Sequence, residues 1–192
     1  MRFCIYCASS ALAPEHYSSS AFELGQLLAQ ANITVVYGGG GVGSMGRLAD
    51  GVLSKNGQII GVMPKFMKDL EWGHSKVADF TWTNDLAERK AKLLEHADAV
   101  IALPGGCGTF EELMEVITLK RLGIFVKPVI IVNQNGYYDP LIALFERSVQ
   151  DRFMDARHLT MYSVVSNVSE VIDAVRNAVP WDANARDFAA MR

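Results

Sequence analysis

The stretch from Pro104 to Thr109 has the residue types of a pocket for a small anion. Its sequence, Pro-Gly-Gly-Cys-Gly-Thr, has three glycines in four residues and separates an apolar run from an amphipathic segment. Glycines let the backbone approach a ligand, and the helix predicted from Thr109 directs unpaired N–H groups and its positive dipole end to the same place. The alternative is a tight connection with Thr109 as N-cap, but a cap needs only one glycine. The stretch therefore predicts a phosphate pocket.

Two glutamates follow in the first turn of this predicted helix. Glu112 shares a helical face with Val116 and Leu119, whereas Glu111 lies with Glu115 on the more polar side. A carboxylate between apolar side chains and beside a phosphate pocket is suited to act as a general base or a nucleophile. The alternative is simple stabilisation of the helix dipole, worth about 0.3–1 kcal/mol.

Arg89 and Lys90 are the cations best placed to join this chemistry. They flank the apolar stripe of the helix predicted over Leu86–His96 instead of opposing it. Long side chains often lie along apolar surface with their charge in water, which is the alternative interpretation. Two adjacent cations beside one stripe nevertheless require an anionic partner, and either the phosphate or Glu112 would serve.

A second glycine-rich turn covers residues 38–46, with the sequence Gly-Gly-Gly-Gly-Val-Gly-Ser-Met-Gly. It contains the G-x-G-x-x-G spacing of the dinucleotide fingerprint. That fingerprint belongs on the first strand–helix turn, with an acidic residue closing the next strand. Here the turn follows the second predicted strand, and the next one, Ile59–Met63, ends in no acid. The turn therefore predicts a close backbone wall around a sugar or base, to which we assign Gly39 and Gly40.

Composition excludes several other classes of protein. The 192 residues are half apolar and one-fifth charged, and a formal net charge of −3 leaves no basic footprint for nucleic acid or an anionic membrane surface. No apolar window approaches the roughly 18 residues of a membrane span, and no signal-peptide pattern is present. Cys4, Cys7 and Cys107 make no disulfide framework, so we expect a cytoplasmic protein. The four histidines are scattered, so no metal site is expected.

Short apolar runs alternate with amphipathic segments along the chain. The predicted strands are Phe3–Cys7, Thr34–Tyr37, Ile59–Met63, Val77–Trp82, Ala99–Leu103, Val129–Val132 and Ser163–Val165. The predicted helices are Glu15–Gln30, Ser44–Lys55, Leu86–His96, Thr109–Leu122, Asp139–Arg152 and Val168–Val179. This alternation predicts an α/β fold with a doubly wound, mostly parallel sheet covered by helices on both faces. We expect one domain over residues 1–179 and a C-terminal tail over 180–192.

The predicted sheet directs attention to three turns. Ligands of such sheets bind outside the carboxyl ends of the strands, which here means the turns after Cys7, Tyr37 and Leu103. A further turn, Tyr-Tyr-Asp-Pro at residues 137–140, predicts a helix start with Asp139 as N-cap.

Residues 104–112, Pro-Gly-Gly-Cys-Gly-Thr-Phe-Glu-Glu, match the motif PGGxGTxxE, and Arg89-Lys90 precedes it at the accompanying separation. On these residues the chain resembles the LOG family, cytokinin riboside 5′-monophosphate phosphoribohydrolases, many of which were first labelled possible lysine decarboxylases. The resemblance covers nearly the whole chain. Further matching stretches are residues 6–10, 37–46, 122–128 and 135–139.

The resemblance implies a Rossmann-like nucleotide-binding fold and hydrolysis of the N-glycosidic bond of adenosine 5′-monophosphates. Arg89 and Glu112 would be the catalytic pair. The residues expected to bind the substrate are Ser9, Gly39, Gly40, Glu71, Arg89, Lys90, Gly105, Gly106, Cys107, Gly108, Thr109, Phe110, Glu111, Glu112 and Thr118. The implied partners are a nucleoside monophosphate and a second copy of the chain in a homodimer. No metal or cofactor is required.

Two other functions fit the same pattern less well. The first is a non-catalytic carrier of a nucleotide or phosphorylated cofactor, which Arg89 and Glu112 argue against. The second is a pyridoxal-phosphate lysine decarboxylase, whose Schiff-base lysine and pyridine partner the sequence does not show. The chain also departs from the family pattern, chiefly at Leu86 and Ala87, where a Met-His pair is frequent, and at Cys107, where Tyr is frequent. These positions bear on base preference.

Overall fold

The computed structural model describes residues 1–68 and 73–189, which form a seven-stranded sheet in the order β4-β3-β2-β1-β5-β6-β7. Every neighbouring pair of strands is parallel. The strands are β1 (Arg2–Tyr6), β2 (Thr34–Tyr37), β3 (Ile59–Pro64), β4 (Asp79–Thr83), β5 (Ala99–Ala102), β6 (Val129–Val132) and β7 (Ser163–Val165). The prediction of a parallel α/β sheet is confirmed.

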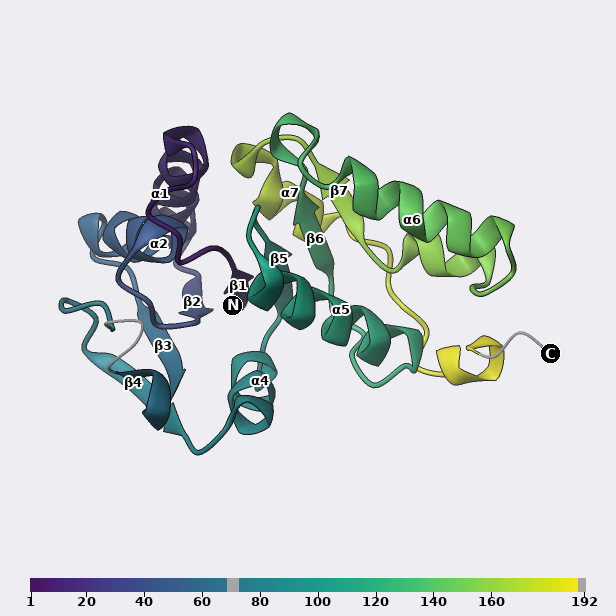
Figure 1. Cartoon of the computed structure of the whole chain (residues 1–192), viewed down its shortest axis with the longest axis horizontal. Helices are drawn as coiled ribbons and strands as arrows, with labels where there is room; N and C mark the ends of the chain where they lie inside the picture. The colour runs from purple at the N-terminus through teal and green to yellow at the C-terminus, as the bar shows by residue number, and fades with distance from the viewer. Residues whose placement is uncertain (69–72, 190–192) are drawn as a thin grey trace.

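Helices cover both faces of this sheet. They are α1 (Glu15–Gln30), α2 (Gly43–Ser54), α4 (Leu86–Leu94), α5 (Cys107–Arg121), α6 (Asp139–Gln150) and α7 (Val171–Arg176). In Figure 1, α4 lies on the opposite side of the strands from α1 and α2. Short 3-10 segments occupy Lys65–Met67, Gln134–Gly136, Ala156–Thr160, Val168–Glu170 and Ala185–Phe188.

Two apolar cores follow from the alternation of side chains along the strands. Odd-numbered residues of β1, such as Phe3 and Ile5, pack with α1, α2 and α7. Even-numbered ones, Cys4 and Tyr6, pack with α4, α5 and α6. Because both faces are buried, the strands read as continuous apolar runs, and this is why the sequence revealed them.

Helix ends differ from the prediction where single residues control the backbone. The helix expected from Thr109 begins at Cys107, because Gly106 is its N-cap. The helix expected over Leu86–His96 ends at Leu94, and His96 takes a left-handed φ of 59°.

Two expectations about the C-terminal half need correction. Residues 168–179 split into a 3-10 turn and α7, with Asn167 in a capping box ahead of them. Asp139 is the first residue of α6 and not its N-cap, a position taken by Tyr138.

The strand order creates one place where the chain winds in opposite directions. From the central strand β1, successive units proceed through β2, β3 and β4, and the chain then returns through α4 to β5 on the other side of β1. The loops after β1 and β5 therefore diverge at the carboxyl edge. Such a switch point is where ligands bind in doubly wound sheets.

The described part of the tail packs on the C-terminal end of α5. The Trp181 indole Nε1 donates to the carbonyl of Lys120 at 2.6 Å, and the Arg157 guanidinium lies 3.8 Å from the centre of the Phe188 ring. Arg121 donates to the carbonyl of Ala189. Trp181, Phe188 and Ala189 thus contact α5 and the 3-10 segment Ala156–Thr160.

Candidate active site

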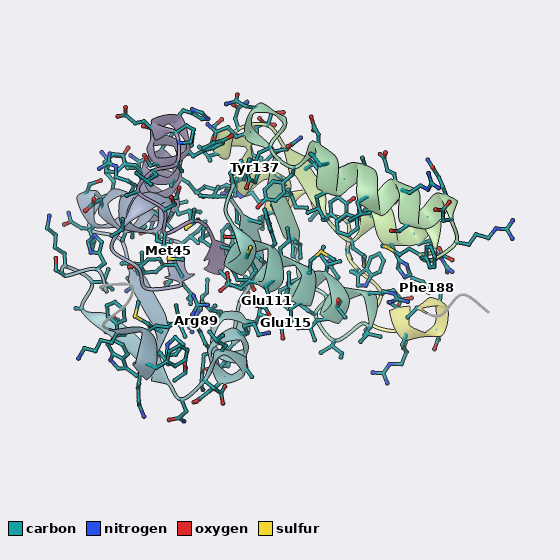
Figure 2. All side chains as sticks on the ribbon, viewed as in Figure 1. Met45, Arg89, Glu111, Glu115, Tyr137 and Phe188 are labelled. Atoms are coloured by element: carbon teal, nitrogen blue, oxygen red, sulfur yellow. The ribbon has the colours of Figure 1, made fainter. Side chains whose placement is uncertain are left out.

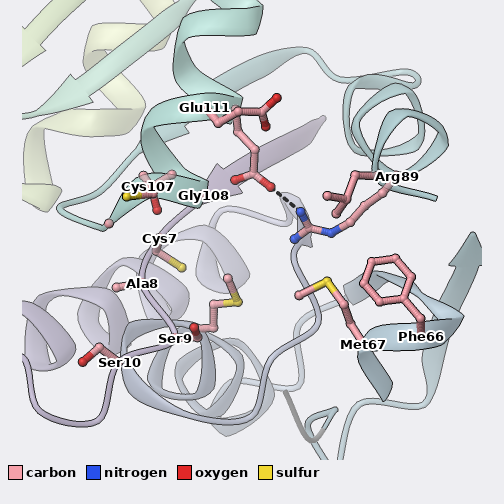
Figure 3. Close-up of a pocket in the computed structure, with 15 residues that line it drawn as sticks. Cys7, Ala8, Ser9, Ser10, Phe66, Met67, Arg89, Cys107, Gly108 and Glu111 are labelled. Atoms are coloured by element: carbon pink, nitrogen blue, oxygen red, sulfur yellow. Dashed lines mark hydrogen bonds and ion pairs between the residues drawn. The ribbon is translucent and has the colours of Figure 1, made fainter. Parts of the chain in front are cut away.

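The centre of the site is an ion pair between Arg89 on α4 and Glu112 on α5. Arg89 Nη1 donates to Glu112 Oε1 at 2.6 Å, drawn as the dashed line in Figure 3. The residues are only 8% and 5% exposed, so this is a buried pair. A charge-assisted bond of this length, shielded from water, holds both groups in a defined geometry. Of the two anions expected to anchor Arg89, Glu112 is one that it contacts.

Two backbone features, at Val62 and Gly38, also determine the position of the Arg89 guanidinium. Arg89 Nε donates to the carbonyl of Val62, on β3, at 3.1 Å. Gly38, which follows β2, leaves the space for the other end, since a Cβ there would lie 2.4 Å from Arg89 Nη2. Arg89 is therefore held by the Val62 carbonyl and by Glu112. Gly38, in the second glycine-rich turn, leaves room for the guanidinium because it has no side chain.

A cavity of about 720 Å³ opens beside the pair at the carboxyl edge of the sheet. It lies at the switch point, between the loop after β1 and the loop after β5 (Figure 3). Its volume suits a nucleotide-sized ligand. The walls consist of Cys7, Ala8, Ser9, Ser10, Met45, Phe66, Met67, Leu86, Arg89, Gly106, Cys107, Gly108, Thr109, Glu111 and Glu112.

The glycine-rich loop after β5 leads into α5 at one end of this cavity. Gly106 is the N-cap, and no side chain caps the helix, so Thr109 is not the cap and lies buried in the first turn. The N–H groups of a first helical turn have no intrahelical acceptor. Those of Cys107 and Gly108, together with the helix dipole, make this end of the cavity suitable for an anion.

Lys90 makes a separate cluster next to the pair. Its ammonium group contacts the carboxylate of Glu111 and lies 3.3 Å from Glu115 Oε2. The hydrogen bond to Glu111 raises the pKa of Lys90, so the group stays charged. Arg89 and Lys90 therefore have different anionic partners. The sequence had offered only the phosphate or Glu112 for both.

Neutral groups lie under the ion pair, on the same face of the sheet. Burial raises the pKa of the Cys4 thiol, and the Glu112 carboxylate raises it further. Burial also raises the pKa of Tyr6, whose hydroxyl is hydrogen-bonded to Cys4. Both side chains stay protonated at neutral pH, so no second anion competes with Glu112 for Arg89 from β1.

Several predicted substrate-binding residues lie away from the cavity wall. Gly39 accepts a hydrogen bond from the His74 backbone, and Gly40 bridges to Gly73. Gly105 lies in the loop before α5, and the outer face of this helix carries Phe110 and Thr118. Lys90 contacts Glu111 and Glu115 instead of lining the cavity. Glu71 lies outside the described residues.

The second glycine-rich turn contributes in a different way from that expected. Gly43, with a φ of 62°, packs against the backbone of Ser9 and Ser10, where a Cβ would lie 2.5 Å from the Ser10 carbonyl oxygen. The amide of Met45 donates to the Ala8 carbonyl at 3.0 Å. The second glycine-rich turn thus fixes the loop that follows β1. Of the side chains in this turn, that of Met45 lines the cavity.

Sequence reasoning missed Met45, Phe66 and Met67, which form the apolar wall of the cavity together with Leu86, a position already expected to bear on base preference. Phe66 and Leu86 are 57% and 49% exposed, and exposed apolar side chains gathered around one cavity mark a ligand-binding groove. The available signal was position: Phe66 and Met67 follow the carboxyl end of β3, at the edge of the sheet where ligands bind.

Three further observations concern the part of the chain that the structure describes. Among residues 1–68 and 73–189, no cluster of three or more His, Cys, Asp or Glu side chains is arranged to hold a metal ion. Within the same residues, no helix has the length and apolarity needed to cross a membrane. Cys4 and Cys7 are buried and Cys107 is exposed, and all three are free thiols.

The fold and the cavity place the chain in the class of Rossmann-like α/β proteins with a site at a switch point. A family model described as possible lysine decarboxylase matches residues 45–175. The chain is 39% identical over 181 residues to cytokinin riboside 5′-monophosphate phosphoribohydrolase LOG1 of Arabidopsis thaliana, covering 93% of this chain and 84% of the relative. It belongs to the LOG family, which confirms the resemblance found in the sequence.

Two rice proteins support the same assignment. The chain is 44% identical over 155 residues to the probable cytokinin riboside 5′-monophosphate phosphoribohydrolase LOGL1 of Oryza sativa, covering 81% of this chain and 70% of the relative. It is 38% identical over 188 residues to the phosphoribohydrolase LOG of the same species, with coverage of 94% and 78%.

Solved structures share the fold at lower identity. The molybdenum cofactor carrier protein of Chlamydomonas reinhardtii superposes with a TM-score of 0.70 at 21% identity, covering 92% of this chain and 96% of that one. A structural-genomics target, TM1055, gives a TM-score of 0.70 at 24% identity, with coverage of 91% and 96%. These similarities establish the architecture.

Proposed function

We propose that this chain hydrolyses the N-glycosidic bond of adenosine 5′-monophosphates, releasing the free base and ribose 5-phosphate. Its best substrates carry an apolar N6 substituent, as cytokinins do, and AMP is a weaker one. The observation that carries the proposal is the buried Arg89–Glu112 pair in the wall of a nucleotide-sized cavity, beside the N-terminus of α5. The names of the relatives that share the fold and the motif agree with it.

The chemistry follows from what the bond requires. When the bond between C1′ and the base breaks, its electrons leave with the base, which takes up a proton, and the sugar becomes an oxocarbenium-like cation that water captures. Glu112 can stabilise this cation, attack it as a nucleophile or activate the water. Arg89 can position the phosphate or sugar, or offset charge on the departing base. Binding of the remote phosphate helps position the reacting bond.

The cavity walls orient the substrate. The backbone N–H groups at Gly106–Gly108 suit the 5′-phosphate, because the helix dipole favours negative charge there. The apolar wall of Met45, Phe66, Met67 and Leu86 suits a base and an apolar substituent on it. The sugar then lies between the two, next to Glu112.

The first test measures base release. Purified protein is incubated with isopentenyladenosine 5′-monophosphate, AMP and the two matching nucleosides, and free base is quantified by chromatography. We expect release from the monophosphates only, and its loss in Glu112→Gln. Glu115→Gln is the matched control, because this glutamate lies on the same helix and pairs with Lys90. Nucleotide binding without base release would instead identify a non-catalytic carrier.

The apolar wall gives a second test of the same proposal. Leu86→Ala and Phe66→Ala each remove apolar surface from the cavity. Loss of one such contact is worth about 1–3 kcal/mol in substrate discrimination. The ratio of kcat/KM for the isopentenyl substrate to that for AMP should therefore fall at least fivefold. An unchanged ratio in both variants would place the substituent elsewhere.

We further propose that the chain forms a homodimer through the outer face of α5. Phe110 and Met114 are exposed one turn apart on this face, and the exposed Leu122 and Ile124 follow directly after the end of the helix. Exposed apolar stripes of this kind mark protein interfaces. Sedimentation should show a dimer that Met114→Lys dissociates. The control is Leu144→Lys, at a leucine on α6 that is also exposed, and this variant should remain dimeric.

We also place the protein in the cytoplasm. Cys4, Cys7 and Cys107 are free thiols, as is usual in reducing compartments. Fractionation of cells that express the tagged chain tests this location, and recovery with an extracellular or organellar fraction would refute it.

A further inference from the structure

Two tyrosine hydroxyls hold the glycine-rich loop from the side of α6. Tyr138 Oη donates to the carbonyl of Leu103 at 2.7 Å, and Tyr137 Oη donates to the carbonyl of Gly105 at 2.5 Å. These are the carbonyls on either side of Pro104. Neither tyrosine belongs to the cavity wall. The two tyrosines therefore contact the glycine-rich loop from the side opposite the cavity.

The turn that carries the tyrosines is itself fixed. Asn133, directly after β6, accepts from the Tyr138 amide at 2.7 Å and donates to Asp139 Oδ1 at 2.7 Å. Asn135 and Gly136 take left-handed φ values of 54° and 71°, which turn the chain back toward β5. Tyr138 is buried, and Tyr137 lies partly exposed near the start of α5 (Figure 2). Burial raises the pKa of both hydroxyls, so they remain donors.

The geometry of the Gly105–Gly106 peptide shows how the Tyr137 contact affects the direction of the Gly106 N–H. The carbonyl of Gly105 and the N–H of Gly106 belong to one planar trans peptide and point in opposite directions. A hydroxyl that holds the carbonyl on the α6 side therefore turns the N–H toward the other side, where Gly106 lines the cavity. The two flanking residues are glycines, so rotation of this peptide meets little steric resistance. A flipped peptide would present an oxygen to the phosphate in place of a donor.

We propose that Tyr137 is a positioning residue for phosphate recognition, which holds the Gly105–Gly106 peptide with its N–H directed at the 5′-phosphate. Tyr138 anchors the preceding carbonyl, and Asn133 fixes the turn that presents both rings. This inference rests on the proposed function only for the identity of the anion.

The informative variant is Tyr137→Phe, because it removes the hydroxyl and keeps the ring packed with Phe110 and Tyr17. KM for isopentenyladenosine 5′-monophosphate and the inhibition constant of inorganic phosphate should both rise about tenfold, the effect of one hydrogen bond to a charged group. We expect kcat to change by less than about threefold. A purely structural role would not separate KM from kcat in this way.

Tyr162→Phe is the matched control, because Tyr162 is a partly buried tyrosine that packs on Phe145, away from the loop. It should leave both constants unchanged. The melting temperature is measured for each variant. If Tyr137→Phe does not fold, Asn133→Ser, which shortens the side chain that fixes the turn, takes its place with the same expectation.

Direct titration with AMP separates this inference from the proposed function. If the parent hydrolyses its substrate and Tyr137→Phe has unchanged KM and phosphate inhibition, the inference is wrong and the function stands. If the parent binds AMP without hydrolysis and the variant binds it about tenfold more weakly, the inference stands and the function is wrong. A parent that neither hydrolyses nor binds AMP would overturn both.

Discussion

Substituting Gly38 by alanine tests the geometry of the site without changing any charge. The added Cβ would lie 2.4 Å from Arg89 Nη2, whereas ordinary contacts begin at 3.4 Å, so the guanidinium has to move by roughly 1 Å. It cannot move freely, because Nε is bonded to the Val62 carbonyl and Nη1 to Glu112. Gly38 does not have a left-handed φ, so alanine strains only the contact with the cation and with Met45.

A misplacement of this size in a catalytic group costs about 100-fold in rate. We therefore expect kcat/KM of Gly38→Ala for isopentenyladenosine 5′-monophosphate to fall by about two orders of magnitude, with a folded protein by circular dichroism. Gly73→Ala is the control, because the nearest atom to its Cβ would be Phe80 Cζ at 3.3 Å. A Gly38→Ala enzyme within threefold of the parent would refute the argument that Gly38 seats the guanidinium.

Three further predictions concern stability. Glu112→Gln leaves the buried Arg89 guanidinium without the negative charge of Glu112. The free energy of unfolding should therefore fall by about 3 kcal/mol and the melting temperature by roughly 6–12 °C. An unchanged melting curve would show that the pair does not stabilise the fold. Tyr138→Phe leaves the Leu103 carbonyl without its donor and should cost about 1–3 kcal/mol in denaturant unfolding, and a smaller loss would mean that water replaces the hydroxyl. Burial lowers the pKa of Lys120 to about 8 from 10.5. Between these pH values the unfolded chain therefore binds more protons at this lysine than the folded chain does. As a result, the contribution of Lys120 to the free energy of unfolding increases as the pH rises from 8 to 10.5. Relative to Lys120→Met, the parent should thus gain unfolding free energy over that interval, and a difference that does not change with pH would contradict this assignment.

Much of the fold was predictable because burial on both faces leaves a plain pattern. β2, β6 and β7 have the predicted bounds, as does α1. The predicted ends failed where a turn depends on one backbone conformation, as at His96, or on which residue caps a helix, as at Gly106. β4 begins two residues after the predicted start, because its polar edge-strand sequence gives little apolar periodicity.

The candidate site was predictable where motif and helical spacing agreed. Arg89 and Glu112 were expected together, and they are bonded. The separate pairing of Lys90 with Glu111 and Glu115 was not expected, because it depends on how α4 crosses α5. No local pattern could show that Gly38 faces a guanidinium, since that contact joins segments far apart in the sequence.

The position of Cys107 makes the site accessible to selective chemical labelling. It is the first residue of α5, exposed in the cavity wall, whereas Cys4 and Cys7 are buried and burial raises the pKa of both thiols. A thiol-reactive fluorophore or spin label would therefore attach at Cys107 without prior mutagenesis. Such a label would stand in the cavity beside the N-terminus of α5, where it can report occupancy in real time, and a cysteine-directed electrophile built on a nucleotide would have its anchoring point in place.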